Sequence, residues 1–331
     1  EVRDLRQSTL NWLETMHAEN SEFYQYRLHK NADTSIFASC FSVALLQLWG
    51  ALNDLNQEQR RTWANWIQSF QDKTSGLFCD PENAERATDA LHDVEHLNQQ
   101  LTTFCLSALN ALGSEPLYPL YFLQEWKSEG RLVTWLESLD WYNPWNCGNK
   151  AMFLGIFMAY EWKRNKDTDL KASLDVWFDW HDRYQNPHTG FWGEGRKATY
   201  IDGLGGAYHQ YVVYNYMERP ILYADKIIDR TLFLQQSDGM YSPYLGGASC
   251  YEMDAVDIMV QLYLRHDYRR REIEIALERV MDAVLNIQNP DGGFCWARKV
   301  PFRLRRYLQM MKDLYHHRSV YYWYLNMRAT V

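Results

Sequence analysis

The chain has 331 residues, of which 47 % are hydrophobic and 15 % aromatic, and its net charge is -8. This acidic balance argues against a nucleic-acid partner, because phosphate binding requires a basic face. The hydrophobic fraction suffices for a large buried core, and such an aromatic content is typical of proteins that line a cavity or groove with rings.

Two kinds of helix-like stretch alternate along the chain. Amphipathic, charged stretches, with apolar residues three and four apart, are expected at 2–17, 57–71, 116–128, 168–185, 219–236 and 271–288. Stretches richer in apolar, small and aromatic residues are expected to be more buried and fall at 34–53, 90–112, 144–163, 204–217, 250–265 and 311–328. Because no run alternates polar and apolar residues between turns, the sequence predicts an all-α protein.

A repeated turn follows the charged stretches. Its four copies begin with Gln, contain Gly and place an aromatic residue soon after the Gly; they are Gln71–Phe78, Gln185–Trp192, Gln235–Tyr241 and Gln288–Phe294. The last three copies begin 50 and 53 residues apart, and a degenerate copy is expected at Gln124–Gly130. We expect each Gly to supply a positive φ and each Gln to bond backbone groups of its own turn. A repeat of this length fits two helices.

The order of the two helix types favours a closed arrangement. The first expected helix is of the charged type and the last is of the buried type, so that 2–17 can pack beside 311–328. An open solenoid would instead need polar end caps, and the stretch Tyr315–Met327 is too apolar for one. The sequence therefore predicts one domain over 1–331, an α/α toroid of about six inner and six outer helices around a cavity.

The Gln-x-Asp-Gly-aromatic turns and the two-helix period resemble the terpenoid cyclase and protein prenyltransferase superfamily, over roughly 34 to 328. This resemblance implies an α/α toroid whose inner helices carry the reactive groups at one mouth. Class II terpene cyclases of that superfamily have an Asp-x-Asp-Asp motif whose middle Asp protonates an alkene. Here Glu252 and Asp254 stand in the first two acidic places, and Ala255 replaces the third Asp.

Other residues at the starts of the buried helices complete the expected site. Asp257 lies one helical turn after Asp254, and His209 opens another buried helix, so we expect Asp254, Glu252, Asp257 and His209 to be catalytic. In a ring these starts converge, and the residues expected to bind substrate are Glu95, His96, Trp145, Tyr208, Tyr251, His316 and Arg318. A basic cluster near Arg298–Arg306 is best explained as a solvated loop.

Neither a metal nor a cofactor is expected. No glycine-rich phosphate loop or dinucleotide fingerprint is present. Cys250 and Asp313–His316 resemble fragments of the zinc site of protein prenyltransferases, but Ala248 stands where its first Asp is expected. The six cysteines form no CxxC pair, which favours reduced, buried thiols and a cytoplasmic protein. The longest apolar run, near Ala151–Tyr160, is about half the roughly 20 residues that a membrane span requires.

Three functions follow from these residues. The first is an enzyme that starts a cyclisation or related carbocation step on an isoprenoid by protonation. The second is a carbohydrate-active toroid (a glycoside hydrolase, lyase or epimerase) in which Asp254 or Asp257 is the acid. The third is a non-catalytic binding module. In each case the partner is a small molecule or a docked ligand, and the sequence leaves the oligomeric state open.

Overall fold

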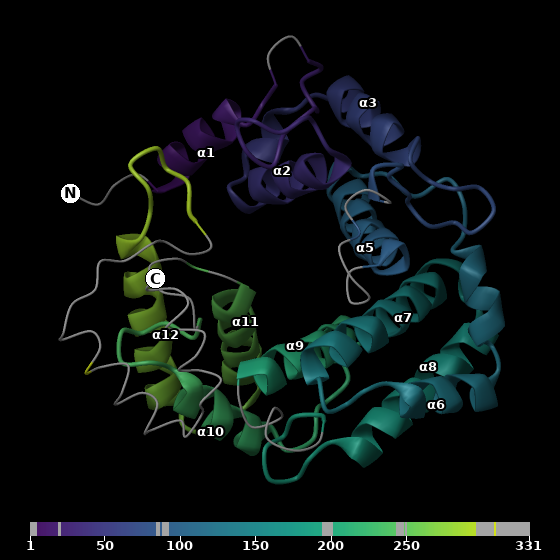
Figure 1. Ribbon diagram of the computed structural model, residues 1–331, viewed down its shortest axis with the longest axis vertical. Helices are drawn as coiled ribbons and strands as arrows, with labels where there is room; N and C mark the ends of the chain where they lie inside the picture. Colours follow the sequence, from purple (N-terminus) through teal and green to yellow (C-terminus); the bar gives the residue numbers. More distant parts are fainter. Residues whose placement is uncertain are drawn as a thin grey trace. The chain divides into compact units, whose positions relative to one another are not determined.

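A computed structural model of the protein (Figure 1) describes residues 5–18, 21–83, 87, 93–193, 201–242, 248, 250–295 and 308. The described residues form helices joined by turns, and their only β structure is three isolated bridges, His17–Tyr26, Arg27–Thr34 and Gln71–Phe78. The prediction of an all-α protein is therefore confirmed.

The chain packs into two compact units, which are described separately. Unit 1 comprises residues 1–127, 160–170 and 290–293, and unit 2 comprises residues 128–159, 171–289 and 294–331. The single toroid domain and its closure stay predictions.

Unit 1 contains a pair of packed helices with an amphipathic helix against them. Its elements are α1 (Leu5–Thr15), α2 (Ile36–Leu48), η1 (Ala51–Asp54), α3 (Gln57–Gln68), α5 (Val94–Leu112) and η2 (Tyr121–Trp126). Helix α2 packs on α5, and α3 packs on α5. Side chains of Ser35, Asn56 and Asp93 cap the starts of α2, α3 and α5 by accepting backbone N–H groups. These caps explain why the three helices begin where they do.

Unit 2 contains the remaining helices and the candidate site. Its elements are α6 (Glu129–Ser138), most of α7 (Pro144–Asn165) and α8 (Thr168–Tyr184), α9 (Ile201–Tyr216), α10 (Ala224–Leu234), α11 (Cys250–Arg265) and α12 (Arg270–Asn286). Helix α11 is flanked by α9 and α12 (Figure 1), and it also contacts α10. The α9 helix is almost wholly buried, whereas α12 buries only Ile273, Ala276 and Val280. Buried and amphipathic helices therefore alternate, as the sequence predicts.

The repeated turns have the expected conformation. Their glycines, Gly76, Gly190, Gly239 and Gly292, all have positive φ, between 72° and 93°. The glutamine side-chain amide donates to the carbonyl of the turn's own glycine in three copies: Gln71 at 2.8 Å, Gln185 at 2.7 Å and Gln235 at 3.0 Å. Both predictions about these turns are thus confirmed where the hydrogen bonds are described.

Each glutamine also reaches beyond its own turn. The same amide groups donate to the carbonyls of Tyr118, Leu222 and Ala276, at 2.8 Å, 2.9 Å and 2.8 Å. The turns therefore join successive repeats. In the fourth turn a Cβ added to Gly292 would lie 2.1 Å from the carbonyl oxygen of Ser8, so the last turn packs against α1 within unit 1.

The middle of the chain differs from the prediction. The helix expected at 116–128 is the short 3-10 helix η2, because Pro116 and Pro119 lack backbone N–H groups and bias the preceding residues toward extended backbone. The expected degenerate turn at Gln124–Gly130 is wrong as well, since Gly130 lies within α6. The expected helix 311–328 and the basic cluster Arg298–Arg306 fall outside the described residues.

The described helices include none with the length and hydropathy that a membrane crossing requires. All six cysteines are free thiols, and Cys40, Cys105 and Cys147 are buried, as expected. The other three are partly exposed.

Candidate functional site

Small residues bring the starts of α7 and α9 into close contact. A Cβ added to Gly206 would lie 2.4 Å from the carbonyl oxygen of Pro144, and one added to Gly205 would lie 2.0 Å from the indole of Trp145. The side chain of Gln210 donates to the carbonyl of Gly148 at 3.2 Å and holds the two helices together. Glycine is required here because the helices approach too closely for any side chain.

Aromatic rings gather where these helices meet α11. The ring of Trp145 lies edge-on to His209, with the centroids 5.5 Å apart, and beside Tyr251 at 4.9 Å. Tyr208 lies next to His209, with ring centroids 6.0 Å apart. His209 and Tyr251 are buried. The structure thus brings four of the expected site residues together.

Asp254 lies one helical turn after Tyr251 and is 2 % exposed. Its Oδ2 atom has no hydrogen-bond partner among the described residues. Burial raises the pKa of this carboxyl well above its usual range, and the nearby charges of Glu252 and Asp257 raise it further. These three effects favour the protonated acid over the carboxylate.

The groups around Asp254 respond to the same environment. Burial, followed by the charges of Asp257 and Asp254, raises the pKa of the Tyr208 phenol. Burial raises the pKa of the Cys250 thiol to about 12, with the charge of Asp254 as the next cause. Tyr208, Cys250 and Asp257 therefore share one electrostatic neighbourhood with Asp254, and both the phenol and the thiol stay protonated at neutral pH.

Glu252 has a defined structural contact. Its Oε1 atom accepts the backbone N–H of Tyr241 at 2.9 Å and also the backbone N–H of Ser242. The Gln236 side chain donates to the carbonyl of Ser242 on the same segment. Glu252 therefore fixes the end of the Gln235–Tyr241 turn to the start of α11, and its charge acts on Asp254 from there.

The other expected residues lie either in unit 1 or outside the described residues. Glu95 and His96 lie at the start of α5 in unit 1, where the Glu95 carboxylate accepts from Gln99 at 3.1 Å and the His96 backbone N–H donates to Asp93 at 2.8 Å. His316 and Arg318 are outside the described residues. Whether these groups join Asp254 stays a prediction.

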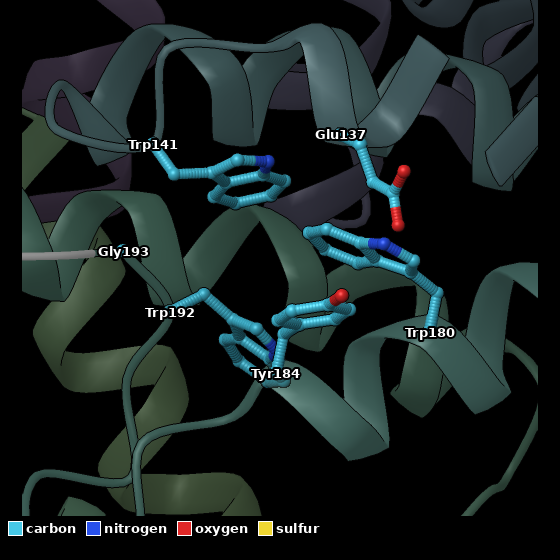
Figure 2. Close-up of a pocket in the computed structure, with 6 residues that line it drawn as sticks. All are labelled: Glu137, Trp141, Trp180, Tyr184, Trp192 and Gly193. Carbon is cyan, nitrogen blue, oxygen red and sulfur yellow. The ribbon is translucent and has the colours of Figure 1, made fainter. Parts of the chain in front are cut away.

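An aromatic pocket that the sequence reasoning missed lies elsewhere in unit 2 (Figure 2). It has a volume of about 200 Å³ and is lined by Glu137, Trp141, Trp180, Tyr184, Trp192 and Gly193. A signal for it was present in the sequence. Trp180 and Tyr184 are four residues apart in a helix and so lie on one face of it. Trp192 follows the repeated Gly190 turn that ends this helix, so all three side chains can lie on the same side of that turn.

The part of the chain described here contains no group of three or more His, Cys, Asp or Glu side chains placed to hold a metal ion. One of the two fragments that resemble a zinc site, Asp313–His316, lies outside that part.

Comparison with known families agrees with this architecture. A family model described as the prenyltransferase alpha-alpha toroid domain matches residues 2–95 and 158–300, which is more than half of the chain. The second matched segment contains α9 to α12 and therefore Asp254 and its neighbours. Searches among curated proteins and among solved structures gave no match.

Proposed function

Because the chain belongs to the prenyltransferase alpha-alpha toroid domain family, we propose that it is an enzyme in which Asp254 protonates an isoprenoid and starts a cyclisation or related carbocation step. The observation that carries this proposal is the state of Asp254. It is a buried carboxyl with a raised pKa, next to aromatic rings, and its Oδ2 atom has no partner among the residues that the structure describes. A neutral carboxylic acid with a free oxygen can give its proton to a substrate.

In the proposed reaction the substrate gains one proton from Asp254 and loses one proton to a base, and both residues belong to unit 2. The proton of Asp254 forms a C–H bond with one alkene carbon, the π electrons supply that bond, and the other alkene carbon becomes a cation. Ring closure moves the positive charge along the substrate. Loss of a proton from the last cation restores a double bond, and we propose His209 as the base that accepts it. The aromatic faces of Trp145 and Tyr251 would stabilise the intermediate cations.

Glu252 and Asp257 act on Asp254 through their charges in this proposal. Each raises the pKa of Asp254 and so keeps it protonated. Glu252 is thereby a positioning residue, since its own carboxylate oxygen is engaged by the Tyr241 and Ser242 amides. Ala255, at the place of the family's third Asp, is a fully buried residue of α11. In this proposal Glu252 and Asp257 are the negative charges that raise the pKa of Asp254, in the absence of a third Asp.

The test is product analysis by mass spectrometry after incubation with a panel of isoprenoids and, in parallel, oligosaccharides. Asp254→Asn keeps the shape of the side chain but removes its acidic proton. Asp282→Asn is the matched control, because Asp282 is exposed on α12. We expect turnover of an isoprenoid by the native protein and the control, and its loss in Asp254→Asn with the fold intact by circular dichroism.

The same panel separates the alternatives. Turnover of an oligosaccharide that depends on Asp254 would replace the isoprenoid proposal by a carbohydrate-active enzyme. An isoprenoid product that Asp254→Asn still forms at the native rate would refute the assignment of the acid. Binding without turnover by every protein would favour a non-catalytic module.

A further inference from the structure

The aromatic pocket of unit 2 has the composition of a ligand site, and we propose that it binds one sugar ring of a saccharide. It lies between the end of α6 and the end of α8, with Trp192 and Gly193 from the segment that follows the Gly190 turn (Figure 2). The proposal does not depend on the chemistry of Asp254, because none of the six lining residues belongs to that group.

The rings of the pocket pack against one another at a moderate tilt. The centroids of Trp141 and Trp180 are 5.0 Å apart with an interplanar angle of 33°, and those of Trp180 and Tyr184 are 4.5 Å apart at 30°. Trp192 is buried, whereas Tyr184 is 49 % exposed, so the pocket is lined by both buried and solvent-accessible aromatic residues. The electron-rich faces of such rings attract the weakly positive C–H bonds on the flat side of a pyranose.

One polar group in the pocket lacks a partner. Trp180 is 6 % exposed, and its Nε1–H has no hydrogen-bond partner among the described residues. The other fully buried tryptophans, Trp63, Trp177 and Trp192, donate this group to Ser39, Ala151 and His181 at 2.7–3.0 Å, whereas the half-buried Trp49, which does not line this pocket, also lacks a described partner. A buried indole N–H normally finds an acceptor, so its absence at Trp180 points to an acceptor brought by a ligand.

Glu137 is the only charged residue among the lining residues. Figure 2 shows its carboxylate beside the Trp180 indole, on the same side as the indole nitrogen. A hydroxyl group placed between them can accept from the indole N–H and donate to the carboxylate at once. A quaternary ammonium would leave the N–H without an acceptor, and a phosphate would be repelled by Glu137. A neutral sugar meets both conditions, because its hydroxyl groups can accept from the Trp180 N–H and carry no negative charge that Glu137 would repel.

The pocket is held in shape before any ligand arrives. The Trp141 Nε1–H donates to the Leu136 carbonyl at 2.8 Å. Gly193 has a φ of 106°, and a Cβ there would lie 2.6 Å from the carbonyl oxygen of Trp141. These contacts fix the positions of Trp141 and of the segment at Gly193, so few side chains of the pocket need to become ordered when a ligand binds. The volume is below the roughly 300–1,000 Å³ of pockets that enclose drug-sized ligands, which fits a single ring.

The experiment is a titration followed by tryptophan fluorescence and saturation-transfer NMR. The probes are methyl glycosides of glucose, galactose and mannose, cellotriose and maltotriose, with choline chloride as a separate arm. We expect millimolar binding of at least one glycoside and none of choline. Trp180→Phe keeps a ring but removes the N–H, and it should weaken binding about threefold to tenfold, as expected for loss of one hydrogen bond. Glu137→Gln should weaken it by a similar factor.

Matched controls keep this test independent of folding and of the proposed enzyme. Trp49→Phe removes another indole N–H that has no described partner, and Glu278→Gln removes an exposed carboxylate on α12; neither should change binding. Asp254→Asn should abolish turnover but leave glycoside binding unchanged. Binding of choline alone would make the pocket a cation cage and overturn the proposal. Glycoside binding that Trp180→Phe and Glu137→Gln leave unchanged, or no binding of any glycoside, would overturn it too.

Discussion

The glutamine of the second described turn offers the sharpest test of how the repeats are joined. Gln185 is 3 % exposed, and its amide donates to the carbonyls of Gly190 and Leu222 at 2.7 Å and 2.9 Å. Gln185→Leu removes both hydrogen bonds. The loss costs about 1–3 kcal/mol at the buried carbonyl of Gly190, which is left without this donor, and about 0.5–1.5 kcal/mol at the part-buried carbonyl of Leu222. We expect the free energy of unfolding to fall by about 1.5–4.5 kcal/mol in total.

Urea denaturation followed by circular dichroism measures this change, and hydrogen exchange with mass spectrometry shows where it acts. Protection should fall in the turn at 186–191 and at the start of α10, because the amide joins these two segments. Gln57→Leu on the exposed start of α3 is the control and should change the free energy of unfolding by less than about 0.5 kcal/mol. An equally small effect of Gln185→Leu, or exchange that changes only in distant segments, would refute the role given to the glutamine.

Three further predictions concern the site in unit 2. The raised pKa of Asp254 means that the folded protein binds this proton more tightly than the unfolded chain, so wild-type stability falls as pH rises above the ordinary Asp pKa. The melting temperature of Asp254→Asn relative to wild type should therefore rise with pH, and a difference that is constant with pH would contradict the assignment. Glu252→Gln removes one charge that raises this pKa, so in its background the same rise should begin at the ordinary Asp pKa but end at lower pH and be smaller in total; a rise of unchanged size would rule out the charge effect. Gly205→Ala should lower the free energy of unfolding by about 1–3 kcal/mol and shift Trp145 fluorescence, because its Cβ would lie 2.0 Å from the Trp145 ring, whereas Gly130→Ala has open space and should cost nothing.

The helices could be predicted because their signals are local. The charged and buried stretches at 271–288 and 250–265 became α12 and α11 with almost the same bounds, since apolar spacing and turn residues set both. The Gly conformations followed from the same turn chemistry. The prediction failed at 116–128, where two prolines outweighed the apolar spacing and left only η2.

The candidate site was predicted only in part, because it depends on which helices meet. The sequence placed Asp254 at the start of a helix of the buried type, with Asp257 one helical turn on, whereas its burial and raised pKa come from the structure. The contact of Glu252 with the Tyr241 and Ser242 amides was not foreseen, since it requires the preceding turn to fold back onto α11. The pocket around Trp180 was missed for a similar reason: its residues come from three segments whose meeting no local pattern reports.

The packing of Gly292 on Ser8 joins backbone segments that are far apart in the sequence, and a Cβ added to the neighbouring Gly293 would lie 2.3 Å from the indole nitrogen of Trp12. Helix α1 leaves the ribosome well before this partner, because most of the described chain lies between them in sequence. Contacts between such distant residues form slowly because a long loop must close first. Until residues 292 and 293 are synthesised, the part of α1 that packs on them stays uncovered by this turn, and a chaperone that binds exposed apolar helices could bind it during that interval.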